Sequence, residues 1–138
     1  MNEWGRARIG ALSEDAFLAA GAALYAGEGA KAEGNIKFAN TDPTMVGFFC
    51  RWLRHFFEID EAWLRVQVYL HEGLDLDAAE SFWSTVTNVP RRQFRKPYRP
   101  IADPSIRRAK HVHGCCYVSY GCSRTHRRIM GLIRALLS

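Results

Sequence analysis

The sequence predicts an α+β fold in which helices pack over a small sheet. Segments with helical apolar spacing alternate with short segments in which apolar and polar residues alternate, in the order helix, strand, helix, strand, helix, strand, helix. The chain has 138 residues, of which 48% are hydrophobic, so it can bury one core and is too apolar to be disordered. We therefore expect a single domain over residues 13–138, preceded by a flexible leader at residues 1–12.

The first half of the domain is expected to contain two helices around a short strand. Residues 13–27 form the first helix, with Ser13 as a favourable N-cap and two acids in the first turn. Apolar and polar residues alternate at residues 35–40, which predicts the strand. Asp42 and Pro43 then begin the second helix, with Asp42 as the N-cap and Pro43 in the first helical position.

Two further strands and two further helices are expected in the second half. The clearest strand is at residues 64–70, and residues 74–88 form the next helix, for which Asp77 and Glu80 resemble a capping box. A basic connector covers residues 91–113. It leads to a strand at residues 114–120 and to a last helix that begins at Ser123 and ends near residue 137.

The charge distribution predicts a polyanionic partner, nucleic acid in the first place. Residues 1–90 hold 7 Lys and Arg against 13 Asp and Glu, whereas residues 91–138 hold 12 Lys and Arg against one acid. The alternative is a basic surface that only keeps the protein soluble.

The polar faces of the strands supply the side chains that such a partner would require. Lys37, Arg65, Gln67 and Tyr69 are expected on one face of the sheet. Arg reads guanine and Gln reads adenine in the major groove, although ordinary solvated strands carry the same residue types. Further DNA contacts are expected from the basic connector, at Arg91, Arg92, Arg95 and Lys110.

The segment Gly21-Ala22-Ala23-Leu24-Tyr25-Ala26-Gly27-Glu28-Gly29 places a carboxylate at the end of a helix rich in small residues. The carboxyl end of a helix carries negative backbone charge, so Glu28 is there in an unfavourable position unless a cation is near. The sequence thus predicts that Glu28 binds a metal ion. The alternative is a surface acid paired with Lys31.

Residues 21–29 resemble the motif of the LAGLIDADG homing endonucleases. The match is good at Leu24-Tyr25 and at Gly27-Glu28-Gly29, and Asn40-Thr41-Asp42-Pro43 opens a helix as in many members. Phe82-Trp83-Ser84, Val89-Pro90 and Gln93-Phe94-Arg95-Lys96 are also similar to small members of the family. The resemblance covers residues 14–137. It departs at residues 21–23, and at Ala26, where the family often has a first acid.

The resemblance implies a site-specific double-stranded DNA endonuclease. Its fold would be of the αββαββα type, with helices on one face of a small antiparallel sheet and a polar sheet face for DNA. A single motif implies a homodimer on a near-palindromic site. The roles implied by the resemblance are a dimer interface at Ala20, Ala23, Leu24 and Gly27, a Mg²⁺ (or Mn²⁺) site at Glu28 and Gly27, and catalytic assistance from Lys96 and Gln67, with Lys110 as a second candidate for the active-site lysine.

Two other functions stay open from the sequence. One is a catalytically inactive LAGLIDADG-type DNA-binding or regulatory protein. The other is a zinc-binding structural module, although the spacing matches no closed zinc site; its residues would come from Cys115, Cys116, Cys122, His111, His113 and His126. The sequence has neither an apolar leader nor a run of about 20 apolar residues, so we expect a cytoplasmic protein with no membrane partner and no small-molecule cofactor.

Overall fold

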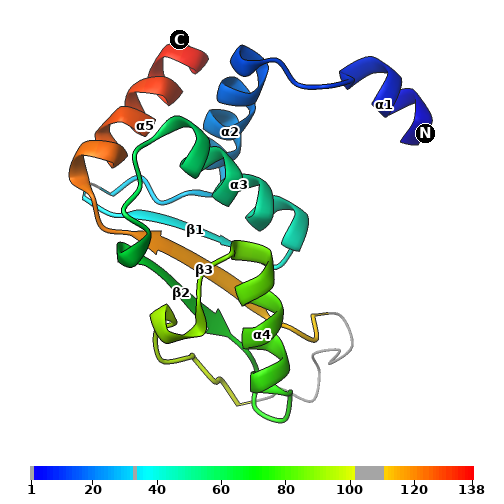
Figure 1. Ribbon diagram of the computed structural model, residues 1–138, viewed down its shortest axis with the longest axis vertical. Coiled ribbons are helices and arrows are strands. Elements are labelled where there is room, and N and C mark those ends of the chain that lie inside the picture. The colour runs from blue at the N-terminus through cyan, green and yellow to red at the C-terminus, as the bar shows by residue number, and fades with distance from the viewer. Residues whose placement is uncertain (1, 33, 102–110) are drawn as a thin grey trace.

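The computed structural model describes residues 2–32, 34–101 and 111–138 (Figure 1). The elements follow one another as α1 (Asn2–Ile9), α2 (Glu14–Glu28), β1 (Ile36–Asn40), α3 (Pro43–Phe56), β2 (Leu64–Tyr69), α4 (Leu76–Thr87), β3 (Cys115–Tyr120) and α5 (Ser123–Leu137). Short 3₁₀ turns precede β2 and follow α4, at η1 (Glu61–Trp63) and η2 (Arg91–Gln93). The α+β prediction is confirmed.

The sheet is antiparallel and has the order β1-β3-β2. In the register of the strands, Val118 of the central strand lies between Phe38 of β1 and Val66 of β2. Two short segments lengthen the sheet at its edges: Gly29 bridges to Phe38 beyond β1, and residues 94–98 run parallel to β2 on its far side. Across the sheet, the order is therefore residues 29–30, β1, β3, β2 and residues 94–98.

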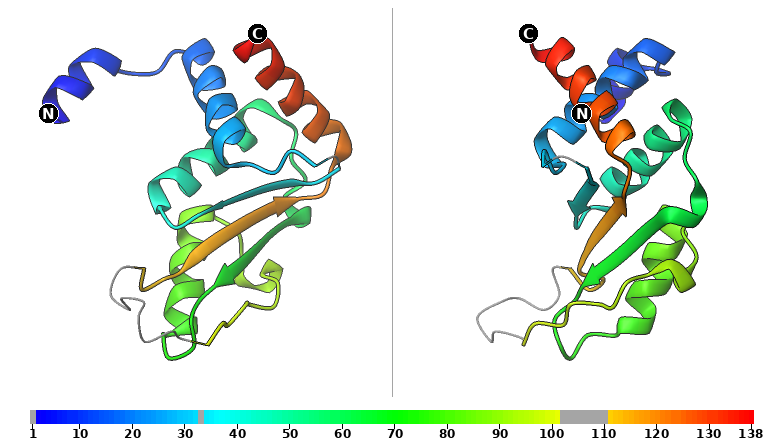
Figure 2. Two further views of the ribbon diagram at one scale, coloured as in Figure 1. Left: turned by 180° about the vertical axis from the view of Figure 1, so that it is seen from behind. Right: turned by 90° about the vertical axis from the view of Figure 1, so that its left-hand side faces the viewer.

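The core lies between one face of the sheet and the helices. Alternation along each strand sends every second side chain to this face, and α3 and α4 cover it (Figures 1 and 2). The largest buried side chains include Trp52, Trp83, Tyr25, Phe38 and Phe49, and the rings of Phe38 and Phe49 are stacked with centroids 4.5 Å apart. α2 and α5 pack together above the β1 edge, as Figure 1 shows.

The second face of the sheet is left open by the described elements (Figure 2, left). It carries the alternate residues of the three strands, which are Lys37 and Ala39 from β1, Arg65, Gln67 and Tyr69 from β2, and Cys115, Tyr117 and Ser119 from β3. The alternation expected for residues 64–70 is thus observed.

Several local predictions are confirmed and others need correction. Ser13 caps α2 by accepting from the backbone N–H of Ala16, and Asp42 caps α3. The N-cap of α4 is Asp75 and not Asp77, which the capping-box pattern indicates. The helix therefore begins at Leu76, before the start that an N-cap at Asp77 would give. Cys122 occupies the N-cap position of α5, so Ser123 is its first residue.

Residues 2–9 of the expected flexible leader form α1, which has no buried residue and projects from the domain (Figure 1). The three strands come singly, each separated from the next by a helix, and do not form the two strand pairs of an αββαββα order. None of the described helices is long and apolar enough to cross a membrane.

Candidate active site and nucleic-acid interface

The three glycines of the 21–29 segment have different surroundings. A Cβ at Gly21 would overlap the indole ring of Trp52, and a Cβ at Gly29 would overlap the ring of Tyr25. A Cβ at Gly27 would meet no atom within 4 Å. Packing inside the chain therefore requires glycine at positions 21 and 29, whereas no contact in the described part of the chain requires it at position 27.

The backbone that follows Glu28 is held by two buried side chains. The Tyr25 hydroxyl donates to the carbonyl oxygen of Ala30 over 2.6 Å, and Nε2 of His126 on α5 donates to the same oxygen over 3.1 Å. Burial raises the pKa of Tyr25, so its hydroxyl keeps the proton that it donates. These bonds fix the end of α2 against β1 and α5.

Glu28 is the last residue of α2 and is exposed to solvent. In the register of the antiparallel bridge between Gly29 and Phe38, it falls opposite Ala39 at the outer edge of β1. Its carboxylate forms no ion pair with any of the described residues; Lys31 instead donates to the carbonyl oxygen of Gly29 over 2.6 Å. The alternative of a Glu28–Lys31 pair is therefore not what the structure contains.

The donor set at this helix end suits a hard cation. Among the described residues, no backbone N–H outside α2 donates to the carbonyl oxygen of Gly27, which is one of the last carbonyl groups of the helix. Carboxylate and carbonyl oxygens are the ligands that Mg²⁺ takes in proteins, usually together with water. Glu28 and Gly27 thus fit the predicted metal, with one carboxylate per chain. No group of three or more His, Cys, Asp or Glu side chains comes together anywhere in the described ranges, at Glu28 or away from it.

The small residues of α2 divide between its two faces. Gly21 and Ala22 are buried against the rest of the protomer, whereas Ala23 and Gly27 are exposed, and Ala20 and Leu24 are half-buried. The residues expected at a dimer interface therefore form a stripe that reaches the surface and leads directly to Glu28.

The topology separates Glu28 from the other two expected catalytic residues. Gln67 lies on β2 and Lys96 lies beyond it, and Nε2 of Gln67 donates to the carbonyl oxygen of Lys96 over 2.9 Å. Strands are spaced about 4.8 Å apart, so about 14 Å separate the strip at residues 29–30 from β2, and about 19 Å separate it from residues 94–98. The sequence placed these three residues in one site. The structure does not bring them together.

Lysines closer to Glu28 were not singled out for a catalytic role. Lys37 is exposed on β1, and its carbonyl oxygen accepts from the backbone N–H of Ala30 over 2.8 Å. Lys31 lies in the loop that follows Glu28. Both lysines lie close to Gly29 in the sequence. That closeness indicates a place near Glu28 only once the bridge between Gly29 and Phe38 is known.

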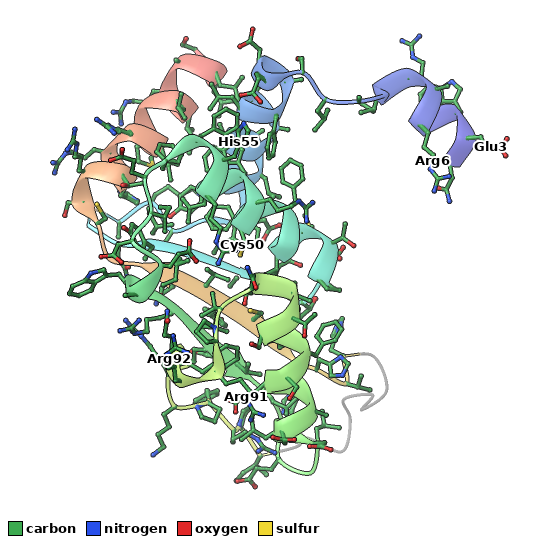
Figure 3. The ribbon with its side chains drawn as sticks, viewed as in Figure 1. Glu3, Arg6, Cys50, His55, Arg91 and Arg92 are labelled. Carbon is green, nitrogen blue, oxygen red and sulfur yellow. The ribbon has the colours of Figure 1, made fainter. Side chains whose placement is uncertain are left out.

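The basic residues expected to contact DNA differ in whether their side chains are already bonded to other parts of the protein. The guanidinium group of Arg91 donates to Asp77 over 2.7 Å and to Glu80 over 3.1 Å, which ties η2 to α4 (Figure 3). The Arg65 guanidinium folds back onto the carbonyl oxygens of Ala62 and Leu64. Arg92, Arg95 and Lys96 are exposed, and their side chains have no ion pair among the described residues. Lys110 lies outside the described residues.

The cysteines and histidines near β3 point in different directions. Cys116 is buried in the core and Cys115 lies on the opposite face of the same strand. His113 stacks on Phe82 with ring centroids 4.0 Å apart, and His126 faces Ala30. The pKa of Cys122 is lowered, chiefly by the hydrogen bond from the Thr125 hydroxyl. The described side chains of this set form no common metal site.

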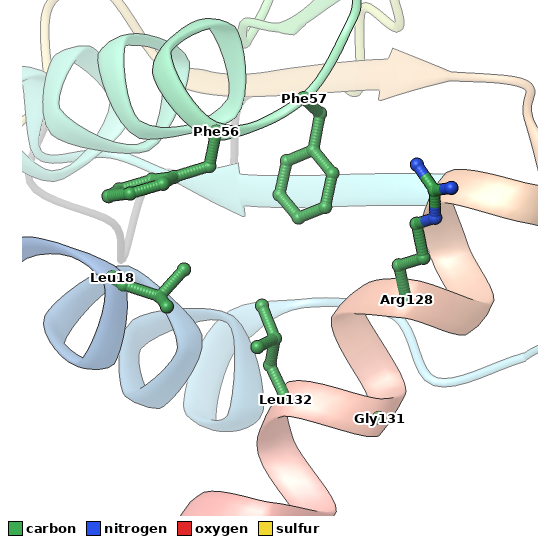
Figure 4. Close-up of a pocket in the computed structure, with 6 residues that line it drawn as sticks. All are labelled: Leu18, Phe56, Phe57, Arg128, Gly131 and Leu132. Carbon is green, nitrogen blue, oxygen red and sulfur yellow. The ribbon is translucent and has the colours of Figure 1, made fainter. Parts of the chain in front are cut away.

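An apolar groove of about 480 Å³ opens between α2, α3 and α5 (Figure 4). It is lined by Leu18, Phe56, Phe57, Arg128, Gly131 and Leu132. Its lining holds no carboxylate and one cationic side chain, Arg128. It also lies away from the open face of the sheet. Comparison with protein-family models and with curated proteins gives no match for the chain.

Proposed function

We propose that the protein is a metal-dependent, site-specific endonuclease of double-stranded DNA that acts as a LAGLIDADG-type homodimer. The observation that carries the proposal is Glu28. Its carboxylate is exposed at the end of α2, has no ion-pair partner among the described residues, and follows a stripe of small residues that reaches the surface at Ala23 and Gly27.

The dimer would join two copies of α2 through Ala20, Ala23, Leu24 and Gly27. Small side chains allow two helix backbones to approach closely, and Gly27 has open space where a Cβ would stand. A two-fold axis along this stripe brings the two Glu28 carboxylates together. Two such charges repel unless a divalent cation lies between them.

The proposed reaction is hydrolysis of a phosphodiester bond. A water molecule adds to phosphorus while the bond from phosphorus to the leaving oxygen breaks; the water loses a proton to solvent, and the leaving oxygen takes up a proton from solvent. Bound Mg²⁺ would lower the pKa of that water and offset charge on the leaving oxygen. Glu28 and Gly27 would hold the metal, and Lys37 and Lys31 would supply positive charge to the phosphate in place of Lys96 and Gln67, which the sheet keeps too far away.

The open face of the sheet would bind the duplex. Lys37 lies on this face, Arg92, Arg95 and Lys96 surround its far edge, and the whole C-terminal third of the chain is basic. Because Arg91 is occupied by α4, it is not among the residues that we propose to contact DNA.

The test is cleavage of a randomised duplex library in Mg²⁺. We expect cleavage by the native chain and none by Glu28→Gln, while DNA binding by that variant is retained. Glu58→Gln is the matched control, since Glu58 is also exposed and also has no ion pair among the described residues. Equal activity of Glu28→Gln and the native chain would contradict the proposal.

The dimer has a separate test in solution. Gly27→Leu should convert a dimer into a monomer, as measured by sedimentation equilibrium, while Gly5→Leu should not. Both glycines are exposed or half-exposed helix positions whose Cβ would meet nothing within 4 Å in the protomer. A native chain that stays monomeric at high concentration and on DNA would rule out the shared Glu28 site.

A second candidate function is a DNA-binding protein of the same type that does not cleave. It is favoured by the separation of Gln67 and Lys96 from Glu28, which leaves the metal site without two of its expected partners. Specific binding of the library without cleavage in either Mg²⁺ or Mn²⁺ would select this function.

A further inference from the structure

Three tyrosines stand in a row across the open face of the sheet. The ring of Tyr69 on β2 stacks on Tyr117 of β3 with centroids 4.3 Å apart and an interplanar angle of 28°, and it packs against Tyr98 with centroids 4.7 Å apart. Together, Tyr98, Tyr69 and Tyr117 form a tyrosine ladder. Tyr69 is in contact with both of the other rings, and Tyr98 at one end of the ladder is 53% exposed.

Gln67 lies beside this ladder in a fixed orientation. It is directly opposite Tyr117 in the pairing of β2 with β3. Its Nε2 donates one hydrogen to the carbonyl oxygen of Lys96 over 2.9 Å, which leaves the second N–H and the amide oxygen Oε1 without a partner among the described residues. The side chain is half-buried, so its remaining donor and acceptor are held in place before any ligand arrives.

One N–H donor next to one carbonyl acceptor is the pattern that adenine complements in the major groove. Adenine presents N7 as an acceptor and its N6 amino group as a donor, and a glutamine amide pairs with both. The partner base, thymine, carries a methyl group in the same groove, which takes apolar contacts. The ring carbons of Tyr117, which lies opposite Gln67 in the strand pairing, can take such contacts.

Other assignments of this face agree less well with its contacts. Arg65, the expected reader of guanine, is held by the carbonyl oxygens of Ala62 and Leu64. Unpaired bases bind by stacking on exposed aromatic rings, but Tyr69 and Tyr117 are already stacked on each other with centroids 4.3 Å apart. The surrounding cations, Lys37, Arg92, Arg95 and Lys96, complement the phosphates of a duplex.

We propose that Gln67 reads an adenine and that the tyrosine ladder contacts the thymine methyl groups beside it, so that each half-site requires an A·T pair at this position. The inference rests on the proposed binding of duplex DNA by the open face. Gln67 lies about 14 Å from the Glu28 strip, which corresponds to about four base pairs of 3.4 Å from the centre of the site.

The test is selection of bound sequences from a randomised duplex pool, without metal, for the native chain and three variants. The native chain should enrich adenine at one symmetric position in each half-site, against the other bases by about 5- to 140-fold. Gln67→Glu should change the preference to cytosine, because a carboxylate only accepts and cytosine presents a donor. Gln67→Met should lose the preference without gaining another, and Arg92→Ala should weaken all sequences alike.

The outcomes separate this inference from the proposed nuclease. A change of preference with Gln67→Glu, together with no cleavage by the native chain, supports the reader and refutes the nuclease. Cleavage with an adenine preference that survives in both Gln67→Glu and Gln67→Met overturns the reader and leaves the nuclease standing. Absence of duplex binding, or tighter binding of oligothymidine that Tyr98→Ala abolishes, overturns the reader. Circular dichroism of each variant confirms that the sheet is intact.

Discussion

Gly21 and Gly27 lie on the same helix but should respond to alanine in opposite directions. A methyl group at Gly21 would enter the indole ring of Trp52, which is fully buried. Trp52 cannot move away freely, because its Nε1 donates to the carbonyl oxygen of Leu18 over 3.1 Å and its ring packs against Phe49 and Phe57. The same methyl group at Gly27 would project into open space.

The magnitudes follow from these surroundings. Overpacking of a core costs about 1–3 kcal/mol, so Gly21→Ala should lower the free energy of unfolding by that amount and the melting temperature by roughly 3–10 °C. Gly27→Ala should raise the free energy of unfolding by about 0.5–1 kcal/mol, because alanine is the better helix former.

Urea denaturation followed by circular dichroism measures both effects. It should be carried out at two protein concentrations, because a dimer makes the unfolding midpoint depend on concentration and would let Gly27→Ala act through the interface. Equal changes in both variants, or a stabilised Gly21→Ala, would refute the conclusion that the two glycines serve different contacts.

The remaining predictions concern surface charge and thiol chemistry. Arg92→Ala should weaken DNA binding and reduce the dependence of affinity on salt. Arg91→Ala should leave affinity nearly unchanged and increase protease cleavage at η2, because the Arg91 guanidinium is bonded to Asp77 and Glu80. Fluorescence anisotropy measures both affinities, and similar losses in the two variants would contradict this assignment. Iodoacetamide should alkylate Cys122 first, at a pH below that required by an ordinary thiol, since the hydrogen bond from Thr125 lowers the pKa of Cys122, whereas burial raises that of Cys50 to about 12. Mass spectrometry across pH 6–9 should lose the fast phase in Cys122→Ser, and early labelling of Cys50 in the folded protein would show that the core opens.

The elements with local signals were predictable from the sequence. The alternation at residues 64–70, the cap at Ser13 and the Asp42-Pro43 helix start depend only on neighbouring residues, and all agree with β2, α2 and α3. The predicted N-cap of α4 was wrong, because Asp75 and Asp77 both suit that position. Asp77 instead accepts a hydrogen bond from Arg91, 14 residues away along the chain.

The candidate site was predictable only in part, because only part of it lies in one continuous segment of the sequence. Glu28 and the small residues of α2 were identified from a continuous segment, and both are accessible in the structure. Gln67 and Lys96 were placed beside Glu28 because family motifs give residue types without distances. The sheet order β1-β3-β2, with residues 94–98 outside β2, puts them at the far edge.

By itself, the sequence determined the order of the helices and strands from α2 to α5, the basic C-terminal third and the unusual position of Glu28 at the end of a helix, because each depends on residues close together in the chain. Only the tertiary structure decided which cations lie near that carboxylate, that Arg65 and Arg91 are already occupied, and that Gln67 is held ready beside three stacked tyrosines. The physical reason is that strand order and register are fixed by burial of one face of the sheet against all the helices together. No local pattern contains that information.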